Sequence, residues 1–189
     1  MNLAAVKVAR EAADNAGRKV WVMGSMGPTP KSLIITAMMQ DPTETFNINV
    51  LTDAYYVQAK ALAEGGVDGF LIETVTDECN AYAALDAVRK VQMENGTDLP
   101  IMLSASIMNS SGCLMTGLSV VDFYESLTKK YSDDPDMLSE LIDAYLVTEN
   151  YSKAIEKMDL LEQILGENEF LTEQRLSIYK RQGNNKKVI

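Results

Sequence analysis

Three polar side chains follow a short apolar stretch in the first half of the chain. Glu73 comes directly after Phe70-Leu71-Ile72, and Asp77 and Asn80 follow in the next turn. If the apolar stretch is a strand of a parallel sheet, these side chains lie at its carboxyl end, where α/β proteins place ligand-binding groups. Glutamates at strand ends are also common as solvated loop residues. The pattern therefore makes Glu73 a candidate binding residue and leaves the solvated alternative open.

The sequence contains no histidine, and this limits the chemistry of the chain. It excludes histidine general acid–base catalysis, Ser-His and Cys-His nucleophiles, and histidine-ligated metal sites within one chain. The two cysteines, Cys79 and Cys113, make neither a disulfide framework nor a zinc motif, because structural zinc sites use four closely spaced ligands. We interpret both cysteines as small buried or loop thiols. Any remaining chemistry depends on carboxylates, lysine, tyrosine or cysteine.

The charge and the apolar pattern exclude several classes of partner. A net charge of -10 argues against nucleic acid and anionic membranes, because both require clustered lysine and arginine. Residues 1–16 include Glu11 and Asp14, so they lack the apolar core of a signal peptide. No stretch reaches the roughly 20 apolar residues of a membrane span. The sequence therefore predicts a cytoplasmic protein with reduced thiols.

The elements that would position Glu73 alternate along residues 1–128. We expect helices at 3–16, 52–64, 77–94 and 120–127, strands at 19–23, 67–75 and 100–107, and loops at 24–30, around 41–42 and at 109–112. Right-handed crossovers would make the three strands parallel. The pattern therefore predicts an α/β fold, either a partial (β/α) barrel or part of an open doubly wound sheet. A closed barrel needs eight strands, so the open sheet edges could pair between chains in a homodimer.

Several short motifs in this segment occur in a recognisable order. They are Gly24-Ser25-Met26-Gly27-Pro28-Thr29, Asp41-Pro42, Glu64-Gly65-Gly66-Val67-Asp68, Leu71-Ile72-Glu73-Thr74, Asn80-Ala81, Ala83-Ala84 and the stretch from Gly112 to Gly117. Together, from about residue 2 to residue 127, they resemble the homocysteine-binding barrel of cobalamin-dependent methionine synthase. The resemblance implies a homocysteine S-methyltransferase of methionine biosynthesis with a TIM-barrel fold.

The resemblance also implies a set of functional groups. In that family three cysteine thiolates hold a zinc ion, cobalamin donates the methyl group, and a glutamate contacts the substrate amino group. Glu73 matches this glutamate, and Asn80 falls in a matching motif, so both are expected to bind homocysteine. Cys79 and Cys113 do not match the zinc cysteines. We therefore expect no metal, no cofactor and no catalytic residue in this chain, and weak or absent methyl transfer by the chain alone.

Residues 129–189 follow a different, purely helical pattern. Four residues recur after 34 positions: Tyr145, Asn150, Lys153 and Ile155 as Tyr179, Asn184, Lys187 and Ile189. This period resembles the tetratricopeptide repeat, with Ala154 at the position of close helix approach. The second copy is degenerate, since Val188 replaces the alanine. Such repeats are protein-binding scaffolds, so residues 131–189 are a candidate surface for a protein partner.

These two patterns predict two domains, residues 1–128 and residues 129–189, joined in a natural or artefactual fusion. The first function hypothesis is a homocysteine S-methyltransferase-like domain that binds homocysteine. The alternative is an interaction scaffold in which the α/β part only supports the helices. A third possibility for residues 131–189 is a helical hairpin that only packs on the preceding segment.

Overall fold

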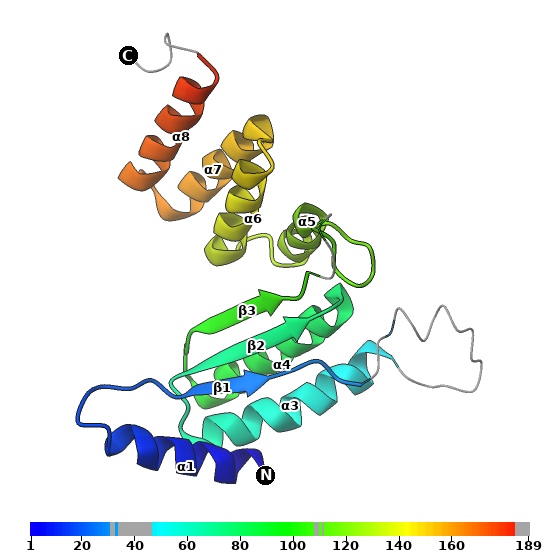
Figure 1. The fold of residues 1–189 in the computed structure, drawn as a ribbon, viewed down its shortest axis with the longest axis vertical. Helices are drawn as coiled ribbons and strands as arrows, with labels where there is room; N and C mark the ends of the chain where they lie inside the picture. The colour runs from blue at the N-terminus through cyan, green and yellow to red at the C-terminus, as the bar shows by residue number, and fades with distance from the viewer. Residues whose placement is uncertain (31–32, 34–46, 108–109, 111, 184–189) are drawn as a thin grey trace. The chain divides into compact units, whose positions relative to one another are not determined.

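The computed structural model describes residues 1–30, 33, 47–107, 110 and 112–183. The chain divides into two compact units, Met1–Gly117 and Leu118–Ile189 (Figure 1). The helix expected at 120–127 therefore lies in the second unit, although the sequence pattern grouped it with the first. Within the described part of the chain, no helix is long and apolar enough to cross a membrane.

The first unit is a parallel sheet with helices on one face (Figure 1). Its elements are α1 (Asn2–Asp14), β1 (Met23–Met26), α3 (Ile48–Gly65), β2 (Gly69–Val75), α4 (Glu78–Asn95) and β3 (Ile101–Ala105). The strand order is β1-β2-β3 and both pairings are parallel. Helix α3 packs beside α4, α3 also contacts β1, and α4 contacts β2. The predicted α/β class and parallel strands are confirmed, whereas the partial (β/α) barrel stays a prediction.

The residues at the two ends of α3 determine where this helix begins and ends. The Asn47 side chain accepts hydrogen bonds from the backbone N–H groups of Asn49 and Val50, at 2.9 Å and 3.3 Å, and so caps the first turn. Gly66 ends the helix with a φ of 86°, as the glycine pair predicted. The expected start at residues 52–53 is wrong by about one turn, because Asn47 caps the helix earlier.

The first strand differs from the sequence prediction. It runs from Met23 to Met26, so it begins at the last residue of the strand expected over 19–23 and otherwise lies in the stretch that we expected to be a loop. A Cβ atom at Gly24 would lie 3.1 Å from Leu62 Cδ1 and 3.2 Å from Val67 Cγ1, closer than side chains normally pack. Gly24 therefore allows α3 to approach β1 closely, and it does not form a turn.

Asp68 joins the start of the chain to the sheet. Its Oδ2 atom accepts hydrogen bonds from the Val22 N–H at 2.7 Å and from Arg10 Nη2 at 2.8 Å. Arg10 also donates to the carbonyl of Gly66 at 2.5 Å. These bonds hold α1 and the segment before β1 beside the start of β2.

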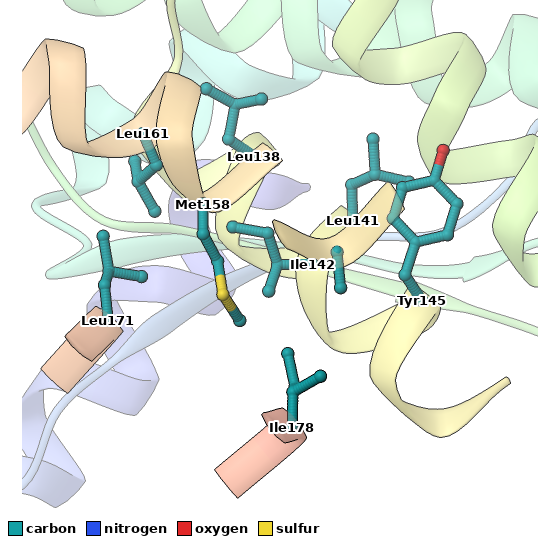
Figure 2. Packing of buried hydrophobic residues seen from close by; sticks show 9 residues of the cluster. Leu138, Leu141, Ile142, Tyr145, Met158, Leu161, Leu171 and Ile178 are labelled. Carbon is teal, nitrogen blue, oxygen red and sulfur yellow. The ribbon is translucent and has the colours of Figure 1, made fainter. Parts of the chain in front are cut away.

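Residues 118–183, the described part of the second unit, form four helices, each packed on the next: α5 (Val120–Lys130), α6 (Pro135–Val147), α7 (Tyr151–Leu165) and α8 (Glu169–Arg181). Side chains from α6, α7 and α8 converge on one apolar core (Figure 2). Its buried members are Leu138, Leu141, Ile142, Tyr145, Ala154, Met158, Leu161, Leu171 and Ile178. The helical pattern is therefore confirmed, and Ala154 is fully buried in the core.

The repeat itself stays a prediction. Asn184, Lys187, Val188 and Ile189, on which the second copy depends, lie outside the described residues. The same is true of Asp41-Pro42 and of Asn109 and Ser111 in the two expected loops.

Candidate functional site

Glu73 lies at the carboxyl end of β2, the central strand of the sheet. Along this strand Phe70 and Ile72 are buried, while Leu71 and Glu73 alternate with them and are partly exposed. Because side chains alternate between the faces of a strand, Glu73 lies on the face away from the covering helices. The sheet therefore presents the carboxylate at its carboxyl edge, as the sequence predicted.

The Glu73 carboxylate has a hydrogen-bond partner in Ser25. In β1, Gly24 and Met26 are buried and Ser25 is exposed, so Ser25 shares the face of Glu73. The register pairs Ser25 with Leu71, which places it diagonally beside Glu73. The Ser25 hydroxyl donates a hydrogen bond to Glu73 Oε1. Sequence reasoning placed Ser25 in a loop and missed this role.

This pair can bind a cation. A carboxylate has about four lone-pair positions on its two oxygens. The bond from Ser25 uses one position on Oε1 and restricts the orientation of the carboxylate. The remaining positions can accept N–H donors from a ligand, so the pair is suited to an ammonium group.

A second polar cluster lies in the interior beside this edge. The fully buried Asp77 caps α4 and accepts hydrogen bonds from both the N–H and Nδ2 of Asn80, each at 2.8 Å. Asn80 Oδ1 accepts in turn from the Tyr55 hydroxyl at 2.9 Å and the Thr29 hydroxyl at 3.2 Å. The cluster therefore holds the segment after β1 against α3 and α4.

Burial raises the pKa of Tyr55 to about 12, so its phenol stays a neutral donor at ordinary pH. Asn80 is only 2% exposed, and both the nitrogen and the oxygen of its side-chain amide form hydrogen bonds in the cluster. These contacts make it a residue that organises the site, and direct contact with homocysteine stays a prediction for Asn80.

Tyr55, rather than Tyr56, lies on the buried face of α3. The structure buries Leu51, Tyr55, Ala59 and Leu62, a spacing of four, four and three residues. The Tyr56 hydroxyl instead reaches Glu94 Oε2 at 2.6 Å in an exposed position. Starting the helix at Asn47 would have brought Leu51 into the pattern and identified Tyr55.

The described residues do not fit the zinc site that the resemblance implies. Burial raises the pKa of the Cys79 thiol, and the neighbouring carboxylates of Asp77 and Glu78 raise it further. This favours the protonated thiol, whereas zinc binds the thiolate. Among the residues that the structure describes, no cluster of three or more cysteine, aspartate or glutamate side chains could hold a metal ion. No chemical step through zinc follows from this arrangement.

The second unit has an open groove of its own, with a volume of about 420 Å³. Glu125 lies in this groove and its Oε1 accepts from the Tyr145 hydroxyl at 2.6 Å and Lys153 Nζ at 2.8 Å. The bond from Lys153, and then that from Tyr145, lowers the pKa of Glu125. These polar groups are paired within the unit, so the groove by itself indicates no ligand. A protein partner for residues 131–189 stays a prediction.

A comparison with protein families supports the first half of the sequence interpretation. The family model described as Homocysteine S-methyltransferase matches residues 1–187. The match includes the sheet that carries Glu73 and continues through the helices of the second unit, well beyond residue 127. The predicted methyltransferase resemblance is therefore confirmed. The tetratricopeptide resemblance, the fusion and the homodimer are not tested by this match.

Proposed function

Because the chain belongs to the homocysteine S-methyltransferase family, we propose that it binds homocysteine as a methyl acceptor and that Glu73 holds the substrate amino group. The observation that carries the proposal is the placement of Glu73 at the carboxyl end of the central strand, partly exposed and oriented by Ser25. The α-ammonium of homocysteine supplies three N–H donors and a positive charge. Hydrogen bonds between an ammonium and a carboxylate are charge-assisted, and are therefore stronger than neutral ones.

The buried cluster supports the same site indirectly. Asn80 and Tyr55 hold Thr29, which lies four residues after Ser25, and so they restrain the segment that follows β1. Gln58 Nε2 also donates to the Ser25 carbonyl at 3.3 Å. A restrained Ser25 keeps the Glu73 carboxylate in one orientation before the substrate binds, which reduces the entropy lost on binding.

We propose acceptor binding by this chain, and we expect weak or absent methyl transfer by the chain alone. Activation of the homocysteine thiol in the family depends on three thiolates, and the described residues do not offer that set of ligands. The raised pKa of Cys79 supports this part of the proposal.

Calorimetric titration of the full chain with reduced homocysteine tests the proposal. Glu73→Gln keeps the size of the side chain and an oxygen acceptor for Ser25, but removes the charge. We expect it to weaken binding by about tenfold or more, since a hydrogen bond to a charged group contributes about 1.5–3 kcal/mol. Glu64→Gln is the matched control, because Glu64 is exposed near the end of α3, close to the amino end of β2.

A ligand without the amino group tests whether Glu73 acts on the ammonium of homocysteine. 4-Mercaptobutanoate keeps the thiol and the carboxylate of homocysteine and lacks only the ammonium. We expect it to bind weakly, with the same affinity for the wild-type chain and for Glu73→Gln. No binding of homocysteine by the wild type, or equal binding by Glu73→Gln, would refute the assigned role.

A further inference from the structure

Strand β2 contains one extra residue next to Glu73. Ile72 pairs with Leu103 and Val75 pairs with Ala105, so Glu73 and Thr74 together oppose the one residue between those partners on β3. This arrangement is a β-bulge, which bends the strand and increases its twist. The bulge lies at the carboxyl edge of the sheet, where it changes the backbone that carries Glu73.

The backbone of the extra residue is strained. Thr74 has a φ of 61°, in the left-handed region that β-branched residues rarely adopt. Among the described non-glycine residues, only Glu149, in the second unit, shares a positive φ. The Thr74 side chain is exposed, so its own burial does not offset this strain. Such conformations persist where the surrounding structure holds them, and they cluster at binding sites.

The apolar core does not require Thr74. Phe70 and Ile72 are buried on the helix side of the sheet, and Val75 is also buried, at 2% exposure. If Thr74 were absent, Val75 would follow Glu73 directly and the alternation would continue in the same phase. The pairing with Leu103 and Ala105 would then be regular. The extra residue therefore changes the local path of the chain at Glu73 and leaves the core pattern as it is.

We propose that Thr74 is a positioning residue, whose strained bulge aims the Glu73 carboxylate toward Ser25 and the ligand. The inference rests on the proposed homocysteine site and extends it. The bulge bends β2 at the residue where the Ser25 hydroxyl meets Glu73 Oε1. A regular strand would direct the Glu73 carboxylate differently relative to Ser25. The strained backbone at Thr74 is therefore required for this orientation.

Deletion of Thr74 from the full chain tests the inference. Because the core alternation is preserved and a strained residue is removed, we expect a folded protein with an unchanged circular dichroism spectrum and a thermal midpoint no lower than that of the wild type. Calorimetry should show a loss of homocysteine affinity of about tenfold or more. A purely structural role would lower the midpoint and the affinity together, so the two readouts distinguish the roles.

Thr74→Gly is the companion variant, because glycine adopts this φ without strain and keeps the bulge. We expect its homocysteine affinity to stay within about twofold of the wild type, and its thermal midpoint to rise by roughly 2–4 °C. A lower midpoint for Thr74→Gly would overturn the claim of strain.

Each remaining outcome is also decisive. A deletion variant that binds homocysteine as well as the wild type, or that does not fold, would overturn the positioning role. The second result would show that the core does need Thr74. No binding by the wild-type chain would instead overturn the proposed function, which separates the failure of that proposal from the failure of this one.

Discussion

The Tyr55 hydroxyl donates a 2.9 Å hydrogen bond to Asn80 Oδ1 and thereby joins the middle of α3 to the first turn of α4. The same oxygen accepts the Thr29 hydroxyl, and the Asn80 amide group donates to the buried Asp77 carboxylate. One asparagine side chain therefore links two helices with the segment after β1. Because a polar group buried without partners is costly, the cluster should be sensitive to the loss of any one donor.

Removal of the Tyr55 hydroxyl should destabilise the first unit. Tyr55→Phe leaves the buried Asn80 with one donor fewer, and we expect the free energy of unfolding to fall by about 1–2 kcal/mol. Urea unfolding followed by the fluorescence of Trp21, the one tryptophan, reports on this unit. Tyr56→Phe is the control, because its bond to Glu94 is exposed and its loss should cost less than about 0.5 kcal/mol. Equal costs would contradict the buried role of Tyr55.

A side chain at Gly24 should disturb the contact between β1 and α3. In Gly24→Ala the new methyl group would lie 3.1 Å from Leu62 Cδ1, and we expect a loss of about 1–3 kcal/mol in unfolding free energy. A Cβ at Gly27 would meet no atom within 4 Å, so Gly27→Ala should be close to neutral. The same urea titration compares the two variants. If Gly24→Ala were as stable as Gly27→Ala, close packing would not be the reason for glycine at position 24.

The contribution of Asp68 to stability should depend on pH. The hydrogen bond from the Val22 N–H, with a further contribution from Arg10, lowers the pKa of Asp68. A lowered pKa in the folded state means that the stabilisation is present above the unfolded pKa of about 3.9, and is lost as the pH falls through the folded value. Asp68→Asn should therefore be less stable than the wild type at pH 7, with a difference that shrinks below about pH 4. Unfolding titrations between pH 7 and pH 3 measure this, and a constant difference would refute it.

A larger side chain at Ala154 should overpack the second unit. Ala154 is fully buried within the core of α6, α7 and α8, so Ala154→Leu should cost about 1–3 kcal/mol. Denaturation followed by circular dichroism at the helical band is the measurement. Ala4→Leu, at an exposed position on α1, controls for the change in residue type and should be nearly neutral. Similar midpoints for the two variants would mean that α7 tolerates a wider spacing than the structure indicates.

Local sequence patterns determined the class of the fold and the position of the best candidate residue. The left-handed Gly66 and the cap at Asp77 act over one helical turn, so the end of α3 and the start of α4 could be predicted without knowledge of the fold. The apolar run before Glu73 identified a buried parallel strand in the same way, since covered strands carry consecutive apolar residues.

Tertiary structure decided which residues lie beside Glu73 and how the backbone orients its side chain. Gly24 belongs to a strand because it pairs with Phe70 of β2, and the close approach of α3 favours glycine there, although a glycine in isolation is equally compatible with a turn. Tyr55 and Asn80 are 25 residues apart and Ser25 and Glu73 are 48 apart, so no short-range pattern could pair them. The bulge at Thr74 depends on the register with β3, which strand pairing alone sets. Periodicity and capping are local properties of the chain, whereas partner choice and register arise only when distant segments pack.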